Sequence, residues 1–356
     1  MNPAGFLVPL GAYAVITVLH LVIPARHVEG YATDTQGRPL HYRLNGRLVF
    51  PATIGLWALA CWAGLLPWDL WWTVRWESLT SACLLGLLFT AAVVLPAPPT
   101  GKGLLADLFL GRPENPQWLG GRVDAKMWLY LVGATQLGLN LYGFAAHHGL
   151  TFADPSPGVA LHVALFSFFL CEYLFFERVH LYTYDLFAER VGFKLGWGCL
   201  VFYPYFYAIA LWNTAILPSP HTPWPVLVLA AVVFFGGWSL ARGANLQKYT
   251  FKRDPTASFL GIAPEVLTDG DRSLLVSGFW GLSRHINYLG EVGMAVGLTL
   301  ALGYPTVWQT WLYPLYYVLL LVPRQFDDDR RCAAKYGPLW EQYVERVPYR
   351  IIPGVF

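Results

Sequence analysis

LVSGFWGLSRHINYLG, residues 275–290, decides the fold because it places Arg, His and Asn at the start of a long apolar run. Apolar segments follow at about 288–304 and 306–323, and the polar tail RQFDDDRRCAAKYGPLWEQYVERVPYRIIP then fills residues 324–353. Segments of this length approach the ~20 residues that cross a bilayer as a helix. Polar side chains beside such segments are costly to bury in lipid and usually mark a functional site. The stretch therefore predicts membrane helices with a polar site at one end.

The rest of the chain has the composition of a membrane protein. Of its 356 residues, 56% are hydrophobic and 13% are charged, whereas soluble domains carry about 25% charged residues. Aromatic residues make up 16%, as expected where rings line both membrane interfaces. The net charge of +2 is too small to suggest a nucleic-acid partner. The five cysteines follow no metal or CxxC spacing, so neither a metal site nor a disulfide framework is predicted.

Nine apolar runs of near-spanning length predict nine transmembrane helices. They lie at about 6–25, 48–66, 79–96, 127–147, 158–177, 192–215, 224–241, 288–304 and 306–323. A tenth span follows if Leu274–Leu282 dips into the membrane. The expected fold is therefore all-α, a polytopic membrane helix bundle with nine to ten transmembrane helices in one domain over 1–356.

Basic residues fall on one side of this predicted bundle. The loops after the first, third, fifth and seventh spans and the C-terminal tail hold almost all of them, and the opposite loops hold only Arg75. The positive-inside rule then makes the C-terminus cytoplasmic. We expect an integral, multi-pass protein of a bacterial inner membrane or the endoplasmic reticulum, depending on the source. The sequence gives no indication of the oligomeric state.

Charged residues at helical spacing predict a polar cluster in the C-terminal part. Lys248 and Lys252 are four residues apart, so on a helix they share one basic face that suits phosphate. The alternative is that the two lysines anchor the helix end at the lipid headgroups. Arg324 and Asp328, also four apart, could pair at a helix end, and the three carboxylates of 327–329 could equally form a solvated acidic turn.

Aromatic and amide side chains accompany these charges. Asn287 could cap a helix that starts near Tyr288. Tyr336, Trp340 and Tyr343 continue an amphipathic helix on which a flat ring system could stack. Cations, aromatic rings and amides together suit a phosphorylated, aromatic cofactor. Because no GxGxxG follows a strand, helices and their loops would have to hold such a cofactor.

Five sequence blocks resemble the sterol reductase family, which includes sterol carbon-14 reductases, 7-dehydrocholesterol reductase and the reductase domain of the lamin B receptor. The C-terminal block consists of two stretches, GFWGLSRHINYLGE and CAAKYGPLWEQYVERVPYRIIP. Earlier blocks are GRPLHYRLNG (37–46), DLFLGRPENPQWLGGRVDAK (107–126), EYLFFERVHLYTYDL (172–186) and RGANLQKYTFKRDP (242–255). The chain departs from the family pattern where RHINY replaces RHPNY and where Cys199 replaces an acid.

The resemblance implies NADPH as the cofactor, bound in residues 224–356, while residues 1–223 lie mainly on the substrate side. By the same resemblance, Lys248 and Lys252 hold phosphates, and Trp280 packs against the cofactor. The cofactor-binding candidates are Lys248, Lys252, Leu275, Trp280, Asn287, Tyr288, Arg324, Asp328, Cys332, Lys335, Tyr336 and Tyr343.

The resemblance also implies reduction of a carbon–carbon double bond in a membrane-dissolved sterol, first of all the 14,15 bond, with the 7,8 and 24(28) bonds as alternatives. An isolated double bond accepts hydride only after an acid has protonated it, and burial keeps a carboxyl protonated near neutral pH. Asp185, Tyr182, Tyr184 and Glu172 are the catalytic candidates. We expect Asp185 to tune one of the tyrosines or to donate the proton itself.

Two other functions remain open at this point. Membrane methyltransferases that use S-adenosylmethionine have a similar C-terminal tail, but the blocks GRPLHYRLNG and QKYTFKRDP have no place in them. A non-catalytic sterol-binding or scaffold protein is the other alternative, since the lamin B receptor shows that this kind of chain can carry structural roles.

Overall fold

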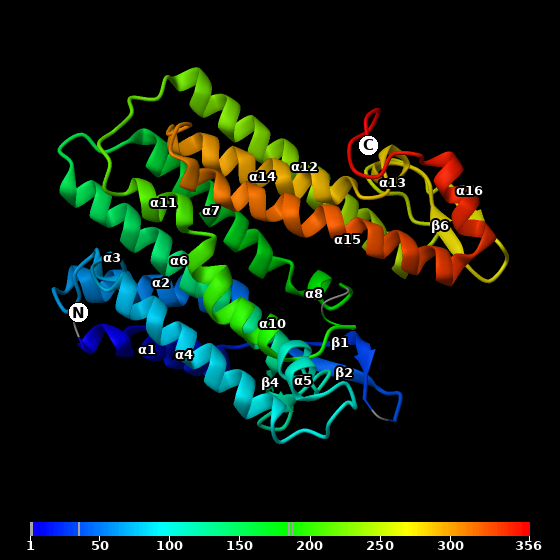
Figure 1. The fold of residues 1–356 in the computed structure, drawn as a ribbon, viewed down its shortest axis with the longest axis horizontal. Helices are drawn as coiled ribbons and strands as arrows, with labels where there is room; N and C mark the ends of the chain where they lie inside the picture. Colours follow the sequence, from blue (N-terminus) through cyan, green and yellow to red (C-terminus); the bar gives the residue numbers. More distant parts are fainter. Residues whose placement is uncertain (1–2, 35, 184–185, 187) are drawn as a thin grey trace. The chain divides into compact units, whose positions relative to one another are not determined.

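The computed structural model describes residues 3–34, 36–183, 186 and 188–356. Two catalytic candidates, Tyr184 and Asp185, lie outside the described residues. The contacts within the chain divide it into two compact units, Met1–Ser219 and Pro220–Phe356. Both units consist mainly of helices (Figure 1).

Unit 1 combines helices with two short antiparallel hairpins. Its helices are η1 (Pro3–Leu7), α1 (Val8–Val22), α2 (Gly46–Trp62), α3 (Leu70–Thr73), α4 (Arg75–Val94), α5 (Leu104–Leu110), α6 (Ala125–Thr151), α7 (Pro157–Phe175), α8 (Glu177–His180), α10 (Phe193–Trp197), the π-helical η2 (Gly198–Phe206) and α11 (Ile209–Thr214). Its hairpins pair β1 (Arg26–Thr33) with β2 (Pro39–Leu44) and β3 (Gln117–Trp118) with β4 (Val123–Asp124).

Helix α6 forms the core of unit 1, and most of its side chains are buried. The Asp124 carboxylate caps its first turn by accepting hydrogen bonds from the backbone N–H groups of Lys126 and Met127. Asn140, in the middle of α6, donates to the carbonyl of Pro204 at 2.9 Å. Pro204 lies in the π-helix η2, where the regular α-helical bonding pattern is interrupted. The buried amide thus supplies a donor to a carbonyl in this irregular segment.

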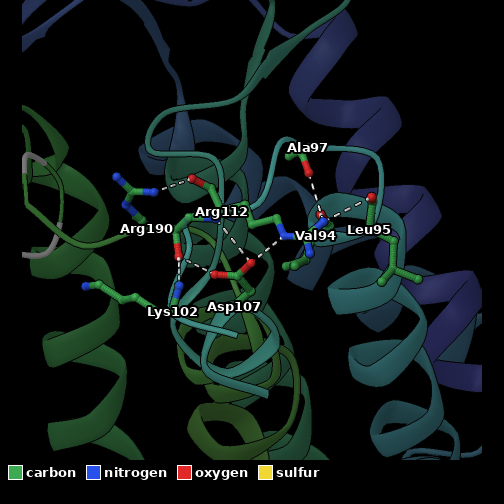
Figure 2. A network of polar contacts seen from close by, with 8 residues as sticks. Val94, Leu95, Ala97, Lys102, Asp107, Arg112 and Arg190 are labelled. Carbon is green, nitrogen blue, oxygen red and sulfur yellow. Dashed lines mark hydrogen bonds and ion pairs between the residues drawn. The ribbon is translucent and has the colours of Figure 1, made fainter. Parts of the chain in front are cut away.

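A charged cluster closes the loop after α4 (Figure 2). Arg112 Nε donates to Asp107 Oδ2 at 2.8 Å, and its Nη1 donates to the carbonyls of Val94 at 3.3 Å and Ala97 at 2.9 Å. The last carbonyls of a helix lack partners inside it and carry partial negative charge. Arg112 therefore caps the C-terminal end of α4. Arg190 extends the cluster by donating to the Arg112 carbonyl at 3.0 Å.

We expect the substitution Arg112→Met to lower the unfolding temperature by several degrees, because it removes the cap of α4 and leaves the Asp107 carboxylate without its cation. Arg190→Met is the matched control, because the Arg190 side chain is more exposed and pairs with the exposed Glu114. Thermal unfolding of both purified variants measures the effect. Equal shifts for the two variants would contradict the capping role.

Unit 2 consists of two long helices, a shorter one between them and a hairpin with short helices at one end (Figure 1). Its elements are α12 (Trp224–Arg253), β5 (Val266–Thr268), β6 (Ser273–Leu275), α13 (Phe279–Leu282), α14 (Ile286–Leu302), η3 (Trp308–Trp311), α15 (Leu312–Tyr336) and α16 (Pro338–Arg346). Strands β5 and β6 pair antiparallel.

Glycines let α12 and α14 approach until their backbones touch. A Cβ atom on Gly290 would lie 2.4 Å from the backbone nitrogen of Ala241 and 2.5 Å from the carbonyl oxygen of Gly237. A Cβ atom on Gly297 would lie 2.6 Å from the backbone nitrogen of Phe234. Small residues allow this close packing of membrane helices. The two helices therefore form one closely packed pair.

Helices cover each of the nine apolar runs, but five of the described helices are long and apolar enough to span a membrane. They are Pro3–Val22, Arg75–Val94, Pro157–Phe175, Phe193–Thr214 and Trp224–Arg253, and Gly46–Trp62 and Ile286–Leu302 are shorter apolar helices. The fold is thus mostly helical with membrane-spanning candidates. The all-α prediction missed the three hairpins, whose short strands lie in segments that we had taken as loops.

Candidate cofactor and catalytic sites

The last turns of α12 carry the predicted basic face. Lys248 and Lys252 are both exposed there, and the Lys248 Nζ lies 5.0 Å from the centre of the Trp280 ring. Trp280 is fixed to the same helix, because its Nε1 donates to the carbonyl of Ala244 at 2.8 Å. Lys335 of α15 acts electrostatically on both α12 lysines. One lysine thus lies beside the indole face, and two further lysines are close enough to act on it or on each other electrostatically.

Gln247 attaches the loop before α13 to α12. Its side chain is 3% exposed, its Nε2 donates to the Ser277 carbonyl at 3.1 Å, and its Oε1 accepts from the Phe279 N–H at 3.0 Å. Both ends of the amide are satisfied, so the loop before α13 and the start of α13, which carries Trp280, are held firmly. Sequence reasoning missed Gln247, although it lies between residues of the predicted phosphate-binding block.

The three consecutive aspartates of α15 have different partners. Asp327 faces Arg330 on the surface at 3.2 Å. Asp328 Oδ2 accepts from the hydroxyl of Tyr288 at 2.6 Å. Asp329 is turned toward the buried Arg284 at 3.4 Å. The interpretation of 327–329 as a solvated acidic turn is therefore wrong for Asp328 and Asp329, because helical geometry turns each carboxylate to a different side.

Asp329 is the centre of a buried charge network. Arg284 Nη2, His285 Nε2 and Arg350 Nε lie 3.4, 3.5 and 3.7 Å from its carboxylate oxygens. Arg284 is 4% exposed and also donates to the Val347 carbonyl at 2.9 Å. Burial alone would raise the pKa of Asp329, but the hydrogen bond from His285 and the positive charges of Arg284 and Arg350 hold that pKa below its ordinary value. The network joins the start of α14 to α15 and to the C-terminal segment.

Asn287 has a different position from the one predicted. Helix α14 begins at Ile286, and the side chain of its N-cap residue, His285, makes no capping hydrogen bond. The prediction that Asn287 caps the helix is wrong, because Asn287 already lies inside the first turn. Its Oδ1 is buried and has no hydrogen-bond partner among the residues that the structure describes. This oxygen can accept a hydrogen bond from a ligand.

The remaining cofactor candidates surround an apolar cluster in the same unit. Trp340 and Tyr343 are buried there with their rings 5.0 Å apart, and Cys332 and Tyr336 pack against them. The Tyr343 hydroxyl donates to the Trp280 carbonyl at 3.2 Å. Trp340 and Tyr343 are therefore buried side chains that support α13, which carries Trp280, and they do not form an open aromatic surface. Leu275 is buried at the end of β6, and Arg324 lies in α15.

Unit 1 holds the described catalytic candidates. Glu172 is 9% exposed and lies in the last turn of α7. Tyr182 is half-buried, and its ring centre lies 6.3 Å from that of Tyr31. The structure describes a further group beside Glu172: the Tyr173 ring lies 4.2 Å from the His180 ring, and His180 Nε2 lies 2.9 Å from the Tyr173 carbonyl oxygen. The sequence signal for Tyr173 was its place in the block EYLFFER.

Glu177 is a buried carboxyl at the start of α8. It is 7% exposed, and its Oε2 accepts from the Gly46 N–H at 3.0 Å, at the beginning of α2. A Cβ atom on Gly46 would lie 2.5 Å from Glu177 Oε1, so glycine is required for this contact. Burial raises the pKa of Glu177 to about 7, against the opposing effects of the Gly46 hydrogen bond and the Arg47 charge.

This raised pKa predicts a loss of stability with rising pH. The folded state binds the Glu177 proton more tightly than the unfolded state, so the free energy of unfolding falls as pH rises from about 4.5 to about 7. The loss amounts to about 3 kcal/mol above pH 7, at ~1.4 kcal/mol per pKa unit. Gln at this position still accepts from Gly46, so Glu177→Gln should lose less stability between pH 5 and pH 8.

Thermal unfolding between pH 5 and pH 8 checks this prediction. Glu114→Gln is the control, because Glu114 is 64% exposed and pairs with Arg190 on the surface. If the unfolding temperatures of wild type and Glu177→Gln depend on pH in the same way, ionisation of Glu177 does not lower the free energy of unfolding and the prediction is wrong.

Comparison with known proteins identifies the family of this chain. The model of the ergosterol biosynthesis ERG4/ERG24 family matches residues 2–356. The chain belongs to this family. The ERG4/ERG24 match confirms the resemblance that the five sequence blocks predicted.

Curated members of the ERG4/ERG24 family align with almost the whole chain. A protein named Delta(14)-sterol reductase from Arabidopsis thaliana is 28% identical over 97% of this chain and 94% of its own length. Delta(14)-sterol reductase TM7SF2 from Mus musculus is 33% identical, over 94% and 82% respectively. Delta(14)-sterol reductase erg24A from Aspergillus fumigatus is 28% identical, over 98% and 81%.

Proposed function

We propose that this protein is an NADPH-dependent reductase of the 14,15 double bond of a sterol dissolved in the membrane. Its relatives in the ERG4/ERG24 family carry the name Delta(14)-sterol reductase. The observation that carries the cofactor assignment is the position of Lys248 beside the Trp280 ring, with Lys252 and Lys335 near enough to act electrostatically in the same cluster. NADPH carries three phosphates and two flat ring systems, so cations next to an indole suit it.

The residues of unit 2 fit this cofactor in a second respect. The buried Oδ1 of Asn287, which lacks a hydrogen-bond partner in the described part of the chain, suits an amide or hydroxyl donor of the ligand. In this proposal Lys248, Lys252 and Lys335 bind phosphates, and Trp280 packs against a ring. Leu275, Tyr288, Arg324, Asp328, Cys332, Tyr336 and Tyr343 complete the surroundings of the cofactor.

The proposed chemistry needs a proton as well as a hydride. When bound, the nicotinamide supplies the hydride. The chain supplies the proton from a hydroxyl or carboxyl that is neutral and shielded from water, and a tyrosine hydroxyl is neutral at physiological pH. We assign this role to Tyr182, Tyr184, Asp185 or Glu172. In this proposal the paired rings of Tyr173 and His180 stabilise the carbocation.

The wider arrangement follows from the same proposal. Residues 1–223 act mainly on the sterol and residues 224–356 mainly on NADPH. The chain crosses the membrane nine to ten times with its C-terminus in the cytoplasm, in a bacterial inner membrane or the endoplasmic reticulum.

Incubation of the purified protein with an 8,14-diene sterol and NADPH tests the proposal. Mass spectrometry of the extracted sterol should show the gain of two hydrogens and loss of the 14,15 double bond, together with oxidation of NADPH. Sterols with 7,8 or 24(28) double bonds serve as parallel substrates, and S-adenosylmethionine serves as the alternative cofactor. Unchanged sterol in every reaction, or transfer of a methyl group, would reject the proposal.

A further inference from the structure

A pocket of about 510 Å³ lies in unit 1 between the β1–β2 hairpin and the loop that joins β3 to β4. Its lining includes four basic or protonatable side chains, namely His27, Arg38, His41 and Arg122. All four are exposed at its rim. None of the residues assigned to NADPH or to catalysis lines this pocket, although Tyr182 packs against the buried cluster that contains Tyr42.

Tyr42 gives this pocket a buried polar group. The side chain lines the pocket and is 1% exposed, yet its hydroxyl has no hydrogen-bond partner within the described ranges. A buried hydroxyl without a partner is unfavourable, and native proteins usually provide one through a ligand or water. The hydroxyl can donate to an anion while the basic rim balances the negative charge.

The acid in the lining cancels only part of this charge. Asp34 is paired with Arg38 at 2.9 Å and also accepts the backbone N–H groups of Gln36 and Arg38. These hydrogen bonds, led by that of Arg38, lower the pKa of Asp34. Asp34 and Arg38 thus offset each other within the turn between β1 and β2, and His41 lies 3.9 Å from Glu29. Arg122 and His27 are the other basic or protonatable side chains of the lining.

The pocket is attached to the end of a membrane-spanning candidate. Arg122 Nη2 donates to the Leu21 carbonyl at 2.8 Å, and Arg43 Nη2 donates to the Ile23 carbonyl at 2.6 Å. Leu21 lies in the last turn of the span Pro3–Val22. Residues next to the end of a span lie at the level of the lipid headgroups, where basic pockets recognise phosphate.

We propose that this pocket binds the phosphate group of an anionic phospholipid, with the Tyr42 hydroxyl donating to a phosphate oxygen and the basic rim neutralising its charge. The apolar side chains of Pro39 and Leu40 in the same lining suit the glycerol part of the lipid. A free phosphate shares the chemistry of the headgroup, so the experiment separates the two sources.

Native mass spectrometry of the full-length protein in neutral detergent tests this site. The probes are dihexanoyl phosphatidylglycerol, inorganic phosphate and dihexanoylglycerol, which lacks phosphate. The variants are Tyr42→Phe, which removes one hydroxyl, and Arg38→Gln, which leaves the Asp34 carboxylate without its cation and so makes the pocket more negative by one charge. Arg26→Gln is the matched control, because Arg26 is exposed on the same hairpin and does not line the pocket.

Wild type and Arg26→Gln should bind phosphatidylglycerol equally, while Tyr42→Phe and Arg38→Gln should each bind about tenfold more weakly, as for the loss of a hydrogen bond or charge to an ionised group. Weaker binding of inorganic phosphate would support the lipid headgroup, and equal binding would support a free phosphate in the same site. Unchanged affinity in both variants would overturn the proposal, as would equally tight binding of dihexanoylglycerol. If Tyr42→Phe does not fold, Arg38→Gln decides.

Discussion

Replacing Lys248 and Lys252 together by glutamate is expected to raise the KM for NADPH about a hundredfold. Each lysine would lose a charge-assisted contact to phosphate worth about 1.5–3 kcal/mol, and 1.4 kcal/mol corresponds to a tenfold change in affinity. The effect should weaken as salt rises, because both side chains are exposed and their charges are screened. Sterol reduction at saturating NADPH should fall much less than the ratio kcat/KM.

Arg253→Glu is the matched control for this variant. Arg253 ends the same helix, but its guanidinium lies over the Tyr249 ring at 5.7 Å rather than beside Trp280. The same reversal of charge there should change KM only slightly. An unaltered KM in the double lysine variant, with the unfolding temperature retained, would remove the basis for placing the phosphates at α12.

Arg284→Met should produce the largest loss of stability, about 3–5 kcal/mol, as when one partner of a buried ion pair is removed. The guanidinium is buried, and without it Asp329 and the carbonyls of Val347 and Pro348 lose their donor. The unfolding temperature in detergent is the measurement.

Two further variants test whether the lost stability comes from the buried charge network. Arg330→Met is the control, because the Arg330 side chain is 79% exposed and its pair with Asp327 should contribute little. Arg284→Met combined with Asp329→Asn should recover part of the lost stability, because the second change removes a carboxylate that has lost its buried cation and keeps only the longer contacts to His285 and Arg350. If Arg284→Met unfolds at the same temperature as Arg330→Met, the buried network has no role in holding unit 2 together.

The sequence predicted features that depend on local spacing. Lys248 and Lys252 share a helix face because four residues make about one turn, and this holds in any context. The nine apolar runs located the helices because burial in lipid demands continuous apolar segments. The family followed from ordered blocks of residues, and the match to the ERG4/ERG24 family confirmed it.

Features that depend on tertiary contacts could not be predicted in this way. Asp328 and Asp329 are adjacent in the chain, yet one contacts Tyr288 and the other Arg284, which lie 40 and 45 residues away in the sequence. Gln247 gave no signal as a loop anchor, since an amide in a helix is ordinarily solvated. The sequence did not distinguish Glu177 from the other acids, because its buried contact with Gly46 exists only in the folded chain.

The glycine contacts between α12 and α14 have a consequence for the proposed binding of NADPH by unit 2. Because backbone meets backbone at Gly237 and Gly290, no side-chain rotamer sets the spacing of the two helices. Lys248 and Tyr288 are therefore carried on a preorganised frame, and little backbone entropy remains to be lost on association. A larger residue at position 290 would push α12 and α14 apart without contacting the ligand itself.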